Sequence, residues 1–340
     1  MKDENIEVIK ISQNISLVTV IKSITNIEAN MEPLNILLKS GEIQEVDYVI
    51  DKEKGTEYKV SYTKKDPKTK QQATMKIGIL FKDFFPTEEQ KYPLISDKHL
   101  KMLLYILSKD EDIFTFYATE FNQLCNIRAR HNKNINTSYK VLKDLLNIEI
   151  RFMEDEEEID LKINEQYEYH PLLKVLKRRD KISNIKVTNE NSQIAAITKK
   201  TMSRALIEIG VGFGELGQMY IPKNLFKIRI DKNNLGATSI LYNLCYLEAI
   251  KNNKKSNTST YNISTILSWI GITEDKYYEF YEKNTNLGYK YFENKIKKIL
   301  LNLADCGVSF NLKPSNIKNI HEFYNKQQVI FDLTKFKKSI

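Results

Sequence analysis

The sequence predicts an α+β protein in which one helix-rich unit occurs twice, after a strand-rich N-terminal segment. Residues 1–95 contain β-prone runs separated by polar turns. Two later regions each contain three helical stretches followed by strand-like runs. Three short segments of the first region each resemble a segment of the second region, and the three pairs occur in the same order. We therefore expect three parts, residues 1–95, 96–224 and 225–340.

The clearest strands of the N-terminal segment lie in "TEYKVSYTKKDPKTKQQATMKIGILF", residues 56–81. Two β-prone runs flank a polar stretch that contains a proline, which is typical of a turn. We expect a β-hairpin here.

Three helices are expected next. Ser96 and Asp97 form an N-terminal helix signal before "KHLKMLLYILSK". A second helix fits residues 118–127, and a third fits residues 134–147. The apolar stripe of the third helix is Ile135, Tyr139, Leu142, Leu145 and Leu146. "IEIRFM" and "EIDLKI" then follow as a hairpin around the acidic "EDEEE". This is the order of a winged helix, with the third helix in the position of a recognition helix.

The same order returns in residues 225–340. "TSILYNLCYLEAIKNN" and "NISTILSWIGI" predict two helices, and "GYKYFENKIKKILLNLADCG" predicts a longer third one that ends at Gly307. "VSFNL" and "QQVIFDL" predict a hairpin around "KPSNIKNIHEFYNK". The echoes are "LLYIL" with "ILYNL", "YATEFNQLCNI" with "YNISTILSWIGI", and "YKVLKDLLN" with "ENKIKKILLNL". They predict two winged-helix domains in tandem.

The stretch "GVGFGELGQMYIPK" contains G-x-G-x-x-G at Gly212, Gly214 and Gly217. A dinucleotide site needs a helix that opens at the last glycine. Here Tyr220 and Pro222 discourage a helix, so we interpret the stretch as a turn between two strands.

Catalytic and metal-binding patterns are missing from the sequence. The chain has no G-x-x-x-x-G-K-[ST] motif, its four histidines are isolated, and its three cysteines are widely spaced. We therefore expect no enzyme activity, no cofactor and no metal. The charged N-terminus and the short apolar runs predict a cytoplasmic protein without a membrane span.

The excess positive charge lies in the last third of the chain. Residues 225–340 contain 18 Lys or Arg and 10 Asp or Glu, whereas the preceding part has 34 of each. A basic region favours a polyanionic partner, because neutralising phosphates releases counterions. The alternative is a lysine-rich surface that reflects composition alone.

Candidate DNA-binding residues lie on both third helices. With the apolar stripe inward, the first of these helices presents side chains to solvent and is preceded by a basic turn. The candidates there are Arg128, Arg130, Lys133, Asn136, Thr137, Lys140 and Lys143. In the second helix the stripe is Phe292, Ile296, Ile299, Leu300 and Leu303. Its outward candidates, with two from the following hairpin, are Lys290, Tyr291, Asn294, Lys297, Lys298, Lys313 and Lys318. Asn pairs bidentately with adenine, and Lys donates to guanine or phosphate. The alternative for each cluster is an ordinary solvated face.

The chain resembles the replication initiators of theta-replicating plasmids, which consist of two winged-helix domains. The resemblance covers roughly residues 96–335 and depends on the architecture, the quasi-repeat and the linker "MYIPKNLFKI" before "SILYNLCYLEAI". It implies binding of origin repeats in double-stranded DNA, recruitment of the host initiator and helicase, and a homodimer that represses its own promoter. The acidic "EDEEE" departs from this pattern.

The function predicted from the sequence is therefore a site-specific duplex-DNA-binding plasmid replication initiator. The first alternative is a winged-helix transcriptional regulator. An ATP-dependent or nicking replication enzyme and a protein-interaction module are further alternatives.

Overall fold

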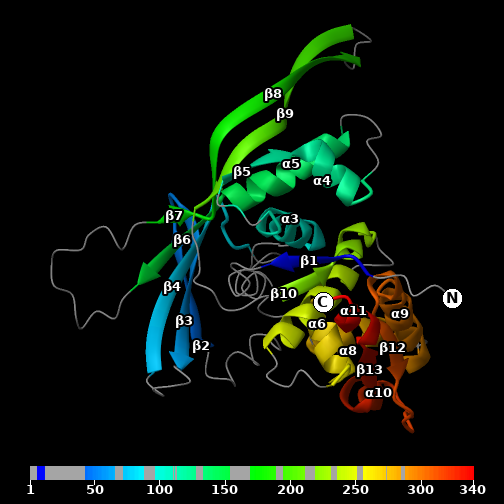
Figure 1. Cartoon of the computed structure of the whole chain (residues 1–340). Helices are drawn as coiled ribbons and strands as arrows, with labels where there is room; N and C mark the ends of the chain where they lie inside the picture. The colour runs from blue at the N-terminus through cyan, green and yellow to red at the C-terminus, as the bar shows by residue number, and fades with distance from the viewer. Residues whose placement is uncertain are drawn as a thin grey trace.

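The structure is a computed structural model of mixed α and β architecture with several sheets (Figure 1). The described parts of the chain are residues 6–11, 43–65, 72–87, 96–109, 111, 113–127, 133–153, 169–188, 194–210, 219–230, 236–250, 256–272, 274–284 and 288–340.

A five-stranded antiparallel sheet lies on one side of the molecule (Figure 1). Its order is β2 (Ile43–Asp51), β3 (Gly55–Lys65), β4 (Gln72–Lys82), β6 (Ile148–Met153) and β7 (His170–Pro171). The predicted hairpin is confirmed, because β3 and β4 pair along their length. The sheet combines strands from both sides of residue 95.

The strand β6 has neighbours that the sequence analysis did not expect. One edge pairs with β4, from Ile148 opposite Phe81 to Met153 opposite Lys76. The other edge pairs with β7 at Glu149 and Ile150. The expected partner "EIDLKI" and the acidic "EDEEE" lie outside the described residues.

The first helical unit consists of α3 (Asp97–Leu107), β5 (Ile113–Tyr117), α4 (Ala118–Leu124), α5 (Lys133–Leu146), β8 (Leu173–Thr188) and β9 (Ile194–Ile209). The three helices confirm the prediction. The hairpin that packs with them is β8–β9, whose strands form a sheet in the order β5-β9-β8. This hairpin projects far beyond the helices (Figure 1).

The second helical unit repeats this arrangement. It contains α6 (Ala237–Ile250), β11 (Thr258–Asn262), α7 (Ile263–Trp269), α8 (Glu274–Lys283), α9 (Tyr289–Leu301), β12 (Ser309–Leu312), α10 (Ile320–Lys326), β13 (Gln328–Asp332) and α11 (Thr334–Lys338). Its sheet order is β11-β13-β12, so the strand after the first helix pairs with the last strand in both units. The α8 and α10 helices were not predicted.

The third predicted helix ends earlier than expected, because α9 ends at Leu301 with Asn302 as its C-cap, and Gly307 instead caps the short turn that follows. A short turn, η4 (Ala304–Cys306), follows α9, and Gly307 takes a φ of 76°. A Cβ at this position would lie 1.9 Å from Cδ1 of Ile6. The left-handed backbone favours glycine here, and the tip of the Ile6 side chain would have to move to admit a Cβ.

A hydrogen-bonded junction connects the two units. The strand β1 (Val8–Ile11) pairs with β10 (Met219–Pro222), which leads into η3 (Lys223–Lys227). The buried Lys101 of α3 donates from Nζ to the carbonyl oxygen of Phe226 at 2.9 Å, and also to that of Ile228. Burial lowers the pKa of the Lys101 ammonium.

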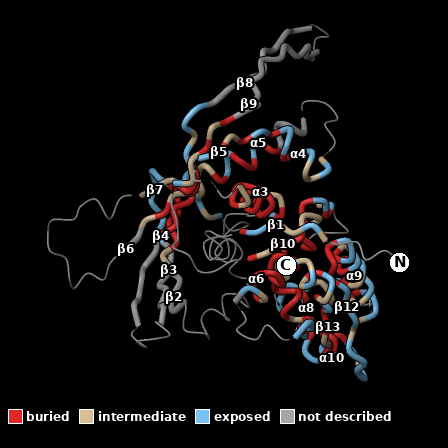
Figure 2. The backbone as a smooth tube through the Cα atoms, in the orientation of Figure 1, coloured by how far each residue is buried: buried red, intermediate tan, exposed pale blue. Residues whose placement is uncertain are grey.

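The N-termini of α3 and α6 meet at the same junction. The carboxylate of Asp97 accepts hydrogen bonds from the backbone N–H of Gly236 at 3.1 Å and from Oγ of Ser239 at 2.6 Å. The α6 helix carries buried residues on all sides, which is typical of a central helix. The buried side chains of both units form one continuous hydrophobic cluster. Figure 2 marks the buried positions of both units in red.

The glycine-rich stretch lies between the strands β9 and β10. A strand rather than a helix therefore comes after Gly217, which agrees with the expectation of a strand–turn–strand segment. Residues 211–218 themselves lie outside the described part of the chain.

Candidate nucleic-acid interface

The α9 helix packs on the core through the stripe that the sequence predicted. Phe292, Ile296, Ile299, Leu300 and Leu303 are all buried, at most 7% exposed. This spacing turns the opposite side of the helix toward solvent.

The outward side of α9 carries Lys290, Asn294 and Lys298, which are all exposed. They are four residues apart and therefore lie one above the other on the helix. The amide of Asn294 thus lies between two ammonium groups. This row offers donors and an acceptor suited to base edges, flanked by charges suited to phosphates.

Two further candidates on α9 have partners within the protein. Lys297 is half-buried and forms an ion pair with Glu293. The ring of Tyr291, 41% exposed, stacks on Phe280 with the ring centres 6.1 Å apart and the planes at 12°. The Glu293 carboxylate therefore neutralises part of the charge of Lys297. The ring of Tyr291 packs on Phe280 and presents one edge to solvent.

Lys313 and Lys318 lie in the segment that joins β12 to α10, and both are exposed. The Nζ of Lys313 donates to Oε1 of Gln328 at 3.1 Å. The backbone N–H of Lys318 donates to Glu322 at 2.8 Å. The pKa of Glu322 is held below its usual range by hydrogen bonds from the side chain of Lys326 and from this backbone group. The segment projects from the second unit at the lower edge of Figure 1.

The structure describes the side chains of only two of the candidate residues in the first unit. Lys140 and Lys143 on α5 are exposed, and the buried side of the helix contains Ser138, Leu142 and Leu145. Lys133, Asn136 and Thr137 lie on the same helix, but their side chains are outside the description. Arg128 and Arg130 lie in residues 128–132, also outside the described residues.

The long β8–β9 hairpin is a candidate surface that the sequence analysis missed. Its strands carry nine Lys or Arg and two acidic residues. Arg179 pairs across the strands with Arg204. The sequence signal was the basic run "LKRRDK", which shows no apolar alternation.

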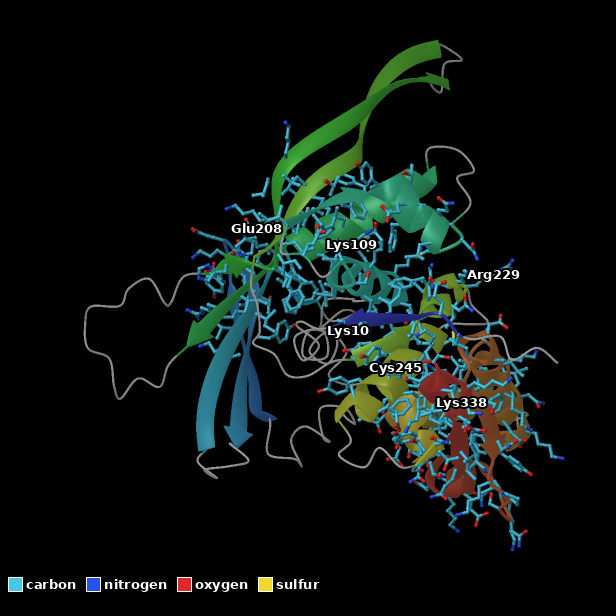
Figure 3. The ribbon with its side chains drawn as sticks, in the orientation of Figure 1. Lys10, Lys109, Glu208, Arg229, Cys245 and Lys338 are labelled. Carbon is cyan, nitrogen blue, oxygen red and sulfur yellow. The ribbon has the colours of Figure 1, made fainter. Side chains whose placement is uncertain are left out.

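The described residues contain no group of three or more His, Cys, Asp or Glu side chains arranged to hold a metal ion. Burial raises the pKa of the thiols of Cys125 and Cys306 to about 12. Within the described helices, none combines the length and the apolar character that crossing a bilayer requires. Figure 3 shows the exposed Arg229 beside the junction of the two units.

No family model matches the chain. No curated protein matches it. Among solved structures, it is similar to selenomethionine derivatives of domain 2 and domain 3 of RctB, with 9% identity and a TM-score of 0.43 over 84% of this chain and 93% of that chain. A second structure of RctB domains 2–3 gives 9% identity and a TM-score of 0.37 over 85% and 90%. Such scores do not establish a shared fold, so the functional proposals below depend on the residues of this chain.

Proposed function

We propose that the protein binds duplex DNA site-specifically, with α9 in the major groove. The observation that carries this proposal is the row Lys290, Asn294 and Lys298 on the side of α9 opposite its buried stripe. A recognition helix needs this combination, because an amide distinguishes bases while flanking ammonium groups hold the backbone.

The shared topology of the two units supports a tandem winged-helix arrangement. In each unit a helix leads to a short strand, further helices follow, and two more strands complete a sheet in which the last strand is central. The third helix of a winged helix enters the groove, and the hairpin after it reaches the backbone. In the second unit the corresponding elements are α9, which is the fourth helix because α8 is inserted before it, and the segment with Lys313 and Lys318.

In the first unit the hairpin β8–β9 takes the place of the wing. It is four times as long as β12, with 16 residues in each strand against four. Its nine basic residues suit a phosphate backbone, whereas the acidic "EDEEE" lies in a different connection, between β6 and β7. The acidic run therefore lies outside the hairpin that we propose as the wing of the first unit.

The biological role that we propose is initiation of plasmid replication in the cytoplasm. In this role the protein binds origin repeats, recruits the host initiator and helicase, and forms a homodimer when it represses its own promoter. It acts without cofactor, metal or enzymatic turnover. These parts of the proposal follow from the resemblance to theta-type initiators.

The DNA-binding proposal is tested by selecting sites from a pool of random duplexes and then measuring fluorescence anisotropy. The double variant K290Q/K298Q should lose at least tenfold in affinity at about 0.1 M salt, since two phosphate contacts disappear. The matched control K52Q/K54Q removes the same charge from the exposed turn between β2 and β3. Equal losses in both variants, or no selected site, would reject the placement of α9 in the groove.

The replication role is tested with the selected sites. A plasmid whose only origin contains these sites should be maintained when the wild-type gene is supplied, and lost when the gene carries Asn294→Ala. Altered transcription from an adjacent promoter without maintenance would instead indicate a transcriptional regulator.

A further inference from the structure

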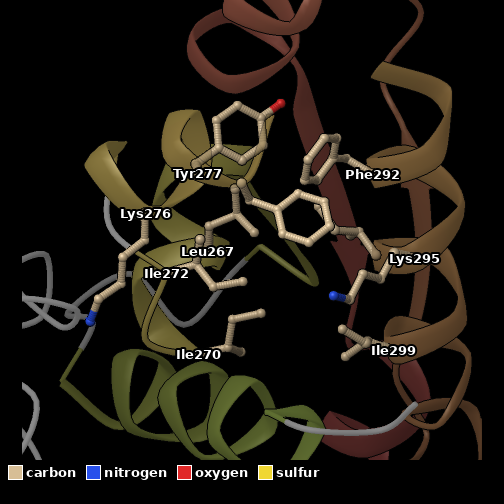
Figure 4. Close-up of a pocket in the computed structure, with 10 residues that line it drawn as sticks. Leu267, Ile270, Ile272, Lys276, Tyr277, Phe292, Lys295 and Ile299 are labelled. Atoms are coloured by element: carbon tan, nitrogen blue, oxygen red, sulfur yellow. The ribbon is translucent and has the colours of Figure 1, made fainter. Parts of the chain in front are cut away.

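A cavity lies behind α9, on the side away from the proposed DNA-binding face. Its volume is about 150 Å³, and its walls come from the end of α7, from α8 and from α9. Figure 4 shows the apolar side chains of Leu267, Ile270 and Ile272 facing Phe292 and Ile299 across it. An apolar cavity of this size holds a benzene-sized ring.

Two lysines border the cavity, and they point in different directions. The ammonium group of Lys295 is directed inward, whereas that of Lys276 points away from the cavity (Figure 4). The Nζ of Lys295 lies 5.7 Å from the centre of the Phe280 ring. Among the described residues that line the cavity there is no carboxylate. One positive charge therefore faces an apolar space without an acidic neighbour in its walls.

We propose that this cavity binds a small organic carboxylate with a ring-sized apolar part. The apolar part would lie between the α7 and α9 side chains, where contact with water is lost. The carboxylate would remain at the mouth and accept a charge-assisted hydrogen bond from Lys295. A neutral ring of the same size gains the apolar contacts but not the charge-assisted hydrogen bond from Lys295, so the site prefers the anion.

The single tryptophan of the chain provides a direct readout of binding. Trp269 is buried at the end of α7, next to the cavity residue Ile270. Occupation of the cavity should change its fluorescence, and no DNA is needed for the measurement. Absence of ligand binding would therefore not contradict the proposed DNA binding, and absence of DNA binding would not contradict the proposed ligand site.

The experiment titrates the full-length chain with benzoate and with benzyl alcohol, and follows Trp269 fluorescence and the unfolding temperature. Wild-type protein should bind benzoate about tenfold more tightly than benzyl alcohol, since a hydrogen bond to a charged group contributes at least that factor in affinity. Lys295→Met should abolish this preference and retain benzyl alcohol binding. Lys283→Met, an exposed lysine of α8 outside the cavity lining, is the matched control and should leave both affinities unchanged.

A space-filling variant gives an independent check. Ile272→Phe adds a ring at a half-buried position in the wall, and should weaken both probes. If neither probe binds the wild-type protein, or if benzoate binding is the same in Lys295→Met as in the wild-type protein, the proposal is wrong.

Discussion

The two helical units share one topology but differ in which element reaches outward. In the second unit the strands are short, at four or five residues, and the exposed helix α9 carries the mixed polar row. In the first unit the strands of the hairpin have 16 residues each and together carry nine Lys or Arg. One topology thus presents an exposed helix face with a mixed polar row in one unit and a long basic hairpin in the other.

The largest expected effect comes from removing charge from the arm of the first unit. The triple variant R178Q/R179Q/R204Q should lower the slope of log affinity against log salt by about 2.7, and the affinity at 0.1 M salt by up to about a thousandfold. The positions lie in paired regions of β8 and β9, where Arg178 faces Ala205 and Arg179 faces Arg204.

Anisotropy titrations on random duplexes over a salt series measure this effect. The control is K52Q/K54Q/K59Q in the N-terminal sheet, which removes the same charge. If the triple variant changes the salt slope no more than the control does, the arm does not contact DNA. The difference between the two units would then have no role in DNA binding.

The second-largest expected effect is a loss of stability when the junction between the units is altered. Lys101→Met keeps most of the side-chain volume but leaves the buried carbonyl groups of Phe226 and Ile228 without their donor. We expect the free energy of unfolding to fall by about 1–3 kcal/mol, the usual cost of unpaired buried polar groups.

Urea unfolding followed by circular dichroism checks this prediction, with the less buried Lys98→Met as the control. If the junction holds the units together, Lys101→Met should also separate their unfolding transitions. Unchanged stability would show that relief from burying an ammonium group offsets the lost hydrogen bonds.

The sequence predicted those parts of the fold that have a local signal. The stripe from Phe292 to Leu303 repeats with the helical period, so α9 and its outward face could be predicted, although the helix ends at Leu301 and not at Gly307. The β3–β4 hairpin was equally local. The candidate residues Lys290, Asn294 and Lys298 follow directly from the helix geometry.

The parts that were missed depend on distant partners or weak patterns. The strand β6 pairs with β4, about 70 residues earlier, and nothing in "IEIRFM" identifies that partner. The strands β8 and β9 are rich in Lys, Arg and Asn, so they lack the apolar alternation that marks a half-buried strand. The α8 helix contains a run of tyrosines, of which only Tyr277 is fully buried.

A smaller and more specific effect is expected at Asn294. Asn294→Ala should cost about 1–3 kcal/mol on a selected site and little on random DNA, because the amide reads a base edge. Parallel anisotropy titrations on both DNAs give the difference. Equal losses on the two DNAs would contradict a reading role and assign Asn294 to backbone contact.

The smallest effect distinguishes two neighbouring lysines of α9. Lys298 is exposed, whereas Lys297 is half-buried and paired with Glu293. Replacing Lys298 by Gln should lower the salt slope by about one, the value for one phosphate contact. Lys297→Gln should lower it by less, because the Glu293 carboxylate already neutralises part of that charge before DNA arrives. Salt titrations on random duplexes resolve the two slopes. If Lys297→Gln has the larger effect, the helix faces DNA with its Glu293 side, and the row of Lys290, Asn294 and Lys298 is not the reading face.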